Sequence, residues 1–191
     1  MVTTPIRKKE DIEKMKNYFM EKGEYRNYTL FVMGINTALR ISDILELKWG
    51  NVYDFKTNQF LLHIEVTEHK TQKHTSVIIN ENLNSALNIL FKTSKPKSPQ
   101  EYMFFSGKDR YSHLSRNRAY HIIKDAALYN NIEGNISCHS LRKTFGYHAW
   151  KCGTSPTLIM NIYNHSSIEI TKRYLSIIQD DKDEVFMKVN L

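Results

Sequence analysis

The sequence contains few cysteines. Only Cys138 and Cys152 occur, fourteen residues apart in an apolar-rich segment, where reduced core thiols are more common than a disulfide. No group of cysteines and histidines has the spacing of a zinc site, and no paired carboxylates indicate a magnesium site. We therefore expect a protein that uses no metal or other cofactor and whose chemistry depends on side chains alone.

Long apolar segments are also missing. No run of about 18 apolar residues occurs, so the sequence predicts no membrane-spanning helix. The start of the chain, residues 1–5, lacks the basic and then apolar layout of a signal peptide. Internal repeats and low-complexity tracts do not occur either. We expect a cytoplasmic protein that forms one domain over residues 1–191.

Positive charge is in excess, with a formal net charge of +7 and a pI of about 9.3. Such an excess favours a polyanionic partner, either nucleic acid or an anionic membrane surface, although many proteins are merely basic. Charges spread over several folded elements can converge on one face and follow a phosphate backbone. The basic groups are spread in this way, at Arg7-Lys8-Lys9, Lys92/Lys95/Lys97, Arg116/Arg118, Arg142-Lys143 and Lys172-Arg173.

The spacing of apolar residues predicts a mainly α-helical chain. Thr4-Pro5 is typical of a helix start, and Gly23 of the end of that helix. Residues 25–39 are apolar nearly all round, which indicates a buried helix, and a short helix is expected from Ser42 to Leu47. Helical spacing returns at residues 83–90. Later helices are expected to begin at the capping residues Ser115, Ser137, Ser155 and Ser166 or Ser167.

A central stretch has the composition of β-strands. Residues 59–67 and 74–80 are rich in β-formers and flank a polar turn, residues 68–73, so we expect an antiparallel hairpin. A further short strand is expected near residues 102–105, after a loop at 92–100 that is too short to link two domains. The predicted fold class is α+β, mainly α-helical with a small antiparallel sheet.

Two basic positions resist a purely structural explanation. Arg40 directly follows the buried helix, and arginine is seldom buried without a partner; an ion pair with Asp43 would be an ordinary explanation. His139 and Arg142 project from about the same face of a helix start, where amide groups favour an anion. An ordinary surface pair explains this second motif as well.

A third position is His165, with Tyr174 nine residues later, directly after Lys172-Arg173. Packing explains any one of eleven tyrosines. Together, however, the arginines, histidines and a lysine could surround one phosphodiester while a tyrosine attacks it. Arginine matches phosphate oxygens with a rigid fork of donors and would stabilise charge on pentavalent phosphorus. A tyrosine nucleophile gives a covalent phosphoester that keeps the bond energy for rejoining.

Three segments resemble the tyrosine recombinase (phage integrase) family. Residues 39–49 (LRISDILELKW) are similar to its first-arginine box, and residues 138–145 (CHSLRKTF) to its His-x-x-Arg box. Residues 164–167 (NHSS) with 171–174 (TKRY) are similar to its terminal box. The resemblance covers nearly the whole chain in the family's order. It implies the catalytic fold of that family and site-specific DNA recombination: integration, excision or inversion.

The resemblance also implies a role for each site residue. Arg40 and Arg142 bind the scissile phosphate, and His139 assists proton transfer. His165 donates a hydrogen bond to the phosphate, and Tyr174 attacks it to form a 3′-phosphotyrosyl bond.

Further positions follow from the same resemblance. A lysine in the hairpin turn protonates the leaving 5′-oxygen; Lys70 matches best, and Lys73 is the alternative. Asp43 supports the first arginine. Three basic neighbours of the site residues are expected to contact DNA: Lys143, Lys172 and Arg173.

The chain departs from the family's pattern in two ways. Asn164 precedes His165 where the family usually has glycine, and asparagine is the best other residue for the left-handed backbone expected there. Arg40 lies so near Met1 that neither a core-binding nor an arm-binding domain fits before it. We therefore expect either a naturally short member, as the fimbrial phase-variation invertases are, or an excised integrase domain.

The resemblance implies double-stranded DNA as the partner, with accessory DNA-bending proteins. It also implies that the chain is a monomer in free solution and forms a homo-tetramer on paired sites. Two other functions stay open: a DNA-binding regulator that keeps the fold without catalysis, and a type IB topoisomerase. Beyond the tyrosine, Val185, Phe186 and Val189 form an apolar stripe at helical spacing. This stripe is expected to pack either on its own domain or in a pocket of the neighbouring subunit.

Overall fold

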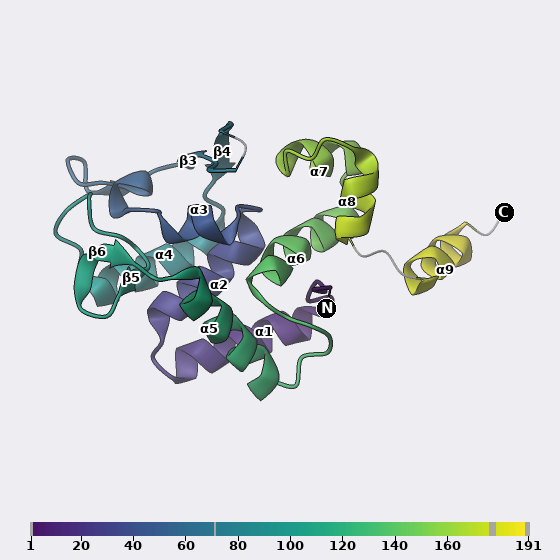
Figure 1. Cartoon of the computed structure of the whole chain (residues 1–191), viewed down its shortest axis with the longest axis horizontal. Helices are drawn as coiled ribbons and strands as arrows, with labels where there is room; N and C mark the ends of the chain where they lie inside the picture. The colour runs from purple at the N-terminus through teal and green to yellow at the C-terminus, as the bar shows by residue number, and fades with distance from the viewer. Residues whose placement is uncertain (1, 71, 176–178, 190–191) are drawn as a thin grey trace.

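The fold was obtained as a computed structural model that describes residues 2–70, 72–175 and 179–189. In these ranges the chain is mainly helical, as predicted (Figure 1). The helices are α1 (Lys9–Glu21), α2 (Tyr25–Asn36), α3 (Ile41–Leu45), the 3-10 turn η1 (Trp49–Asn51), α4 (Glu81–Ser94), α5 (Arg116–Tyr129), α6 (Cys138–Lys151), α7 (Pro156–Ile162), α8 (Ile168–Leu175) and α9 (Gln179–Lys188).

The strands form small antiparallel pairs, β1 with β2, β3 with β4, and β5 with β6. The predicted α+β fold class is therefore confirmed, but the predicted hairpin over residues 59–80 is divided. Its first part, β2, pairs with β1, and only β3 and β4 form the hairpin proper. The bounds are β1 (Tyr53–Asp54), β2 (Gln59–Phe60), β3 (His63–Thr67), β4 (His74–Ile78), β5 (Phe105–Ser106) and β6 (Asp109–His113).

The N-terminal segment corrects one prediction, since Thr4-Pro5 does not begin a helix and α1 starts only at Lys9. Ile6 is buried, its N–H donates to Thr144 Oγ1 at 2.8 Å, and its carbonyl accepts from His148 Nε2 at 3.0 Å. These partners lie on α6, so burial of Ile6 against α6 outweighs the local capping signal.

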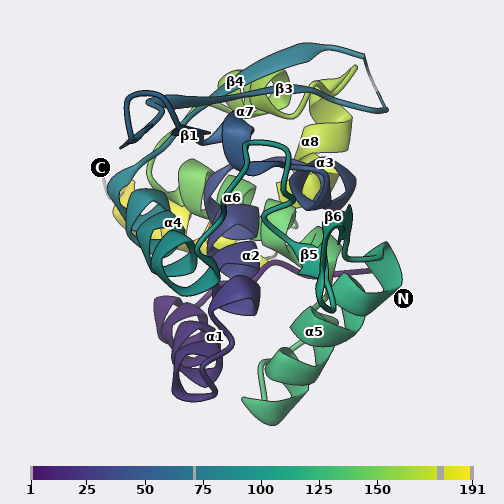
Figure 2. The ribbon, with the colours of Figure 1, turned by 90° about the vertical axis from the view of Figure 1, so that its left-hand side faces the viewer.

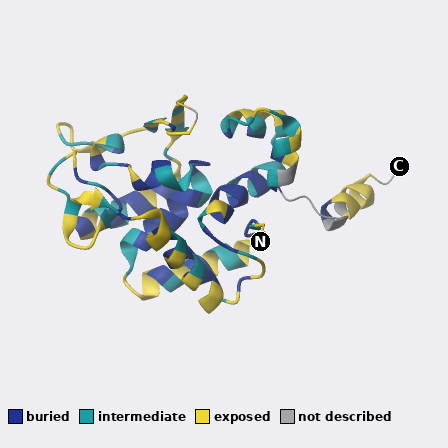
Figure 3. Ribbon diagram, viewed as in Figure 1, coloured by how far each residue is buried: buried dark blue, intermediate teal, exposed yellow. Residues whose placement is uncertain are grey.

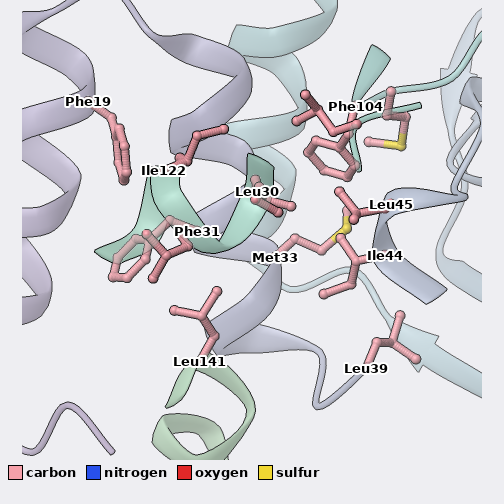
Figure 4. Packing of buried hydrophobic residues seen from close by; sticks show 14 of the residues in the cluster. Phe19, Leu30, Phe31, Met33, Leu39, Ile44, Leu45, Phe104, Ile122 and Leu141 are labelled. Carbon is pink, nitrogen blue, oxygen red and sulfur yellow. The ribbon is translucent and has the colours of Figure 1, made fainter. Parts of the chain in front are cut away.

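Helix α2 is the centre of the core. It packs against α1, α4 and α6 (Figures 2 and 3). In Figure 4, Phe31 lies between Phe19 of α1 and Leu141 of α6, and Leu30 and Met33 lie on the side of Ile44 and Leu45 of α3. The helix ends at Asn36 rather than at Leu39 as predicted, because Ala38 is left-handed, with φ of 58°. A non-glycine residue in that conformation is strained. The strained turn redirects the chain so that the next helix, α3, starts right after Arg40.

Two glycines set how closely α6 lies to its neighbours. A Cβ atom at Gly34 of α2 would be 2.5 Å from Leu141 Cδ1, and one at Gly146 of α6 would be 2.2 Å from the hydroxyl of Tyr163. Both distances are far below van der Waals contact. The absence of these two side chains therefore allows α2 and the end of α7 to pack directly against α6.

The C-terminal helix α9 stands away from the rest of the molecule in Figure 1. Its second half is exposed, including Phe186 at 76% and Val185 at 53%. Near its start, however, Asp181 is buried and pairs with Arg7 Nη1 at 3.0 Å and Lys151 Nζ at 3.1 Å. Ion pairs thus hold the start of α9 on its own domain. The apolar stripe does not pack on that domain, so this one of the two predicted alternatives is wrong.

The two cysteines are both free. Cys138 is mostly buried, and burial raises the pKa of its thiol to about 12. Cys152 follows α6 and is exposed, so its predicted place in the core is wrong. Within the described ranges, every helix is too short or too polar to cross a membrane.

Candidate active site

One cleft, of about 580 Å³, collects the residues predicted to carry the chemistry. It lies where the α2–α3 junction, the β3–β4 turn, the start of α6 and the α7–α8 junction meet. All six predicted catalytic residues line it: Arg40, Lys70, His139, Arg142, His165 and Tyr174. Residues as far apart in the sequence as 40 and 174 therefore share one site.

Arg142 projects from the second turn of α6 and is buried. Its Nη2 donates to the carbonyl of Tyr163 at 2.8 Å, and its guanidinium lies 4.7 Å from the centre of that tyrosine's ring. Its Nη1 is buried without a hydrogen-bond partner among the described residues. Burial, followed by the nearby Arg40, lowers the pKa of Arg142. A buried cation with an unused donor is costly unless an anion joins it, so this end of Arg142 is suited to a phosphate oxygen.

Arg40 is paired with Glu68, a buried residue at the end of β3. The predicted support from Asp43 takes a different form. Asp43 Oδ1 accepts the backbone N–H of His69 at 3.2 Å, and the described ion pairs join Arg40 to Glu68 and not to Asp43. Asp43 therefore holds the hairpin turn beside Arg40, and the direct partner of Arg40 is a residue that the sequence did not single out.

The hairpin turn presents Lys70 to the cleft. The turn is closed by backbone hydrogen bonds, from Glu68 N to Lys73 O at 3.0 Å and from Gln72 N to Glu68 O at 2.8 Å. Lys73 is not among the described residues that line the cleft. This placement favours Lys70 over Lys73 as the lysine of the site.

Tyr174 lies on α8 with its hydroxyl 3.3 Å from His139 Nδ1. Its ring also packs edge-on against those of His165 and Tyr163, each with centroids 5.1 Å away. Burial raises the pKa of Tyr174 to about 12, and this outweighs Arg142 and Arg40, which favour the phenolate. Near neutral pH the tyrosine is therefore protonated, and an attack by its oxygen would need a base.

His139 is the imidazole within reach of the Tyr174 hydroxyl and could act as that base. Partial loss of solvent, followed by the nearby cations Lys143 and Arg142, lowers its pKa from the ordinary value. At neutral pH the imidazole is therefore neutral and can accept a proton from the tyrosine hydroxyl.

His165 follows Asn164, which is left-handed with φ of 54°. The sequence-based expectation for this position is confirmed. His165 Nδ1 lies 3.0 Å from the hydroxyl of Thr171, and burial, followed by Arg142 and Arg40, lowers the pKa of His165 to about 4. In the tautomer in which Nδ1 accepts from Thr171, Nε2 carries the ring proton and could donate it to a phosphate oxygen.

The phage integrase family matches residues 7–180, which is most of the chain. The chain belongs to this family. It is 39% identical over 179 residues to the probable integrase/recombinase YoeC of Bacillus subtilis (strain 168), a match that covers 94% of this chain and 92% of the relative. It is 28% identical over 150 residues to the type 1 fimbriae regulatory protein FimB of Escherichia coli (strain K12), covering 78% and 72%.

Solved structures give the same fold. The chain superposes on XerA recombinase with a TM-score of 0.78 at 19% identity, covering 98% of this chain and 65% of that one. For XerH site-specific recombinase in its post-cleavage complex with the palindromic difH substrate, the TM-score is 0.75 at 17% identity, and the coverage is 96% and 52%. The chain thus spans two thirds or less of these two chains. The predicted fold and enzyme class, a tyrosine-type site-specific DNA recombinase, are confirmed.

The three basic residues expected to contact DNA differ in their exposure. Lys143 is buried, its Nζ donates to the carbonyl of Thr3 at 2.6 Å and lies 5.5 Å from the centre of the Tyr174 ring, so in this structure it faces the site from behind and not the surface. Lys172 is exposed, as a DNA contact requires, and the side chain of Arg173 lies outside the described residues. The sequence missed Arg116, an exposed residue at the start of α5 that lines the cleft. The available signal for Arg116 was its position at a predicted helix start, directly after the capping residue Ser115.

Proposed function

We propose that the protein exchanges DNA strands through a covalent tyrosine intermediate. The oxygen of Tyr174 attacks the scissile phosphorus, a 3′-phosphotyrosyl bond forms, and the bond to the 5′-oxygen breaks. Two observations in one cleft carry this proposal. The Tyr174 hydroxyl lies 3.3 Å from His139 Nδ1. In the same cleft, the buried Nη1 of Arg142 has no hydrogen-bond partner among the described residues. A nucleophile, a base and an anion donor meet there.

Each proton in the reaction has a place to go. His139 takes the proton of Tyr174 as the new bond forms, and Lys70 gives a proton to the departing 5′-oxygen. Arg40, Arg142 and the Nε2 of His165 donate to the phosphate oxygens as charge grows on pentavalent phosphorus. Rejoining runs in reverse, with a 5′-hydroxyl of another strand as the nucleophile.

The partners follow from this chemistry. Double-stranded DNA is the substrate, and Lys172, Arg173 and Arg116 contact phosphates beside the cleft. Integration, excision and inversion all require paired sites, which a tetramer assembled from free monomers would hold, with DNA-bending proteins as accessories. The cytoplasm is the proposed place of action.

A DNA-binding regulator without catalysis is the alternative function. The relative FimB is named a regulatory protein, and this name supports the alternative. A regulator has no need of a tyrosine hydroxyl beside a histidine in the cleft that holds both arginines. The geometry therefore favours catalysis.

Incubation with nicked DNA that carries a candidate site tests the proposal. Cleavage near the nick releases a short fragment, which prevents rejoining and traps the covalent intermediate. We expect a protein–DNA adduct on a denaturing gel, and we expect its yield to persist in excess EDTA. In the described part of the chain, no group of three or more His, Cys, Asp or Glu side chains could hold a metal ion, and the arginines supply the charge instead. A strict magnesium or manganese requirement for cleavage would contradict the mechanism.

Deletion of residues 183–191 tests the role of α9 in assembly. We expect the melting temperature to change by a few degrees at most, because the removed side chains that the structure describes are exposed and the Asp181 anchor stays. Recombination should fall more than DNA binding if the apolar stripe fills a pocket of the neighbouring subunit, where each fully buried side chain contributes about 1.5–3 kcal/mol. Thermal melting and strand exchange on the truncated protein measure both effects.

A matched pair of substitutions serves as the control for the deletion. Phe186→Ser on α9 should reproduce the recombination defect, whereas Leu128→Ser, at another apolar residue that is 65% exposed, should not. A fall in melting temperature by tens of degrees after the deletion would show that the tail belongs to its own core.

A further inference from the structure

Glu68 is a buried carboxylate behind the cleft, with 1% of its surface exposed. Its Oε2 accepts from Arg40 Nη1, and its Oε1 accepts from Asn164 Nδ2 at 3.2 Å. A carboxylate that loses water in this way is stable only when such partners replace the solvent. Both of its oxygens therefore serve contacts to segments far away in the sequence.

These contacts join the three segments that carry Arg40, Lys70 and His165. Arg40 binds the carboxylate directly, Lys70 follows Glu68 by two residues, and His165 follows Asn164 by one. The backbone of Glu68 also closes the hairpin turn that presents Lys70. Displacement of the carboxylate would therefore disturb all three segments at once.

Glu68 does not itself line the described surface of the active-site cleft. It lines a second cavity, of about 430 Å³, between the end of α2, β4 and α7, and Asn164 lines both spaces. The carboxylate thus sits behind the site, where it can hold Arg40 without occupying the place of a phosphate.

The charge of Glu68 also fits this location. Arg40 and Arg142 converge on one cleft and repel each other, so Arg40 lowers the pKa of Arg142. Glu68 acts in the opposite direction on the same group. A negative charge behind Arg40 therefore offsets part of the repulsion that would separate the arginines before DNA arrives.

We propose that Glu68 is a positioning residue for strand cleavage, which fixes Arg40 and the Asn164–His165 segment in the geometry that the phosphate requires. This inference rests on the proposed function. Asn164 has two roles in this arrangement, because it supplies both the left-handed backbone before His165 and the amide that binds Glu68. The glycine usual in the family could supply only the first.

The test compares Glu68→Gln with a matched control, Glu101→Gln. Glu101 is also buried and paired with an arginine, Arg110 Nη1 at 3.2 Å, but it lines no described part of the cleft. Both changes remove one buried charge from an ion pair, so both should lower the melting temperature. Only Glu68→Gln should slow cleavage of nicked DNA, by on the order of 10²-fold, as small displacements of catalytic groups do.

The comparison is made at saturating DNA, with binding measured separately. Positioning predicts that the cleavage defect of Glu68→Gln persists at saturation while DNA affinity changes little, and that Glu68→Asp, which keeps the charge, recovers part of the rate. Equal rates for Glu68→Gln and Glu101→Gln would overturn the proposal. Faster cleavage by Glu68→Gln would overturn it too, because the carboxylate would then compete with DNA for Arg40.

Asn164→Gly provides a second test that does not depend on the folding of Glu68→Gln. Glycine tolerates the left-handed backbone but removes the amide contact to Glu68. We expect native melting and a several-fold slower cleavage; an unchanged rate would remove Asn164 from the proposal. If the unsubstituted protein forms no adduct, the proposed function itself fails, and this outcome is distinct from a normal adduct yield in the Glu68 variants.

Discussion

Tyr174→Phe is expected to bind DNA and to form no covalent adduct. The substitution removes one hydroxyl, the proposed nucleophile, and leaves the ring in its contacts with His139, Tyr163 and His165. The phosphate donors of the cleft are untouched, so DNA affinity should stay near that of the unsubstituted protein. The adduct on a denaturing gel should fall to background, and a DNA-binding titration of the same preparation measures the retained affinity.

Tyr129→Phe is the matched control for this loss. Tyr129 is 69% exposed at the end of α5 and lines no described part of the cleft, so removal of its hydroxyl should change neither adduct yield nor binding. An adduct of undiminished yield in Tyr174→Phe would show that another residue is the nucleophile.

Arg142→Lys is expected to cost far more cleavage than DNA binding. The guanidinium performs two tasks, because Nη2 donates to the Tyr163 carbonyl while Nη1 remains for a phosphate oxygen. An ammonium group keeps the charge but cannot reach both partners. Loss of one donor to the developing charge costs on the order of 10²–10³-fold in rate. Cleavage kinetics at saturating DNA measure this loss.

Arg40→Lys should behave in the same way, since its guanidinium is also shared, with Glu68 on one side and the cleft on the other. The control is Arg110→Lys, a change at an arginine that pairs with Glu101 away from the cleft and should leave cleavage intact. Equal proportional losses of binding and cleavage in Arg142→Lys and Arg40→Lys would mean that these arginines merely attract DNA.

Elements with strong local signals were predictable from the sequence. The hydroxyls of Ser115 and Ser155 accept the backbone N–H groups of Arg118 and Leu158, so α5 and α7 begin where the capping residues indicated. The N-terminal segment was not predictable, because burial of Ile6 against α6 decides its course. Nor were β1 and β6, which are too short or too polar to show a strand pattern.

Which residues line the cleft was predictable from the sequence, but the surroundings of these residues were not. Glu68 meets Arg40 from 28 positions away, and nothing in the sequence spacing predicts that contact. Lys143 was expected at the DNA because it adjoins Arg142 in sequence, and its burial was not predictable from that position. Successive residues of a helix point about 100° apart, so Lys143 does not line the open cleft beside Arg142, and its Nζ donates to the carbonyl of Thr3 behind the site.

Gly34 and Gly146 have a consequence for how this enzyme can diversify. Helix α6 carries His139 and Arg142. Its position depends on the two glycines, because a methyl group at Gly34 would collide with Leu141 and one at Gly146 would collide with Tyr163. A mutational scan scored by recombination would therefore rank these glycines beside the reactive residues, although neither takes part in the chemistry. A change of DNA target can therefore act through exposed residues of the surface, whereas a side chain at either glycine would displace the helix that carries His139 and Arg142.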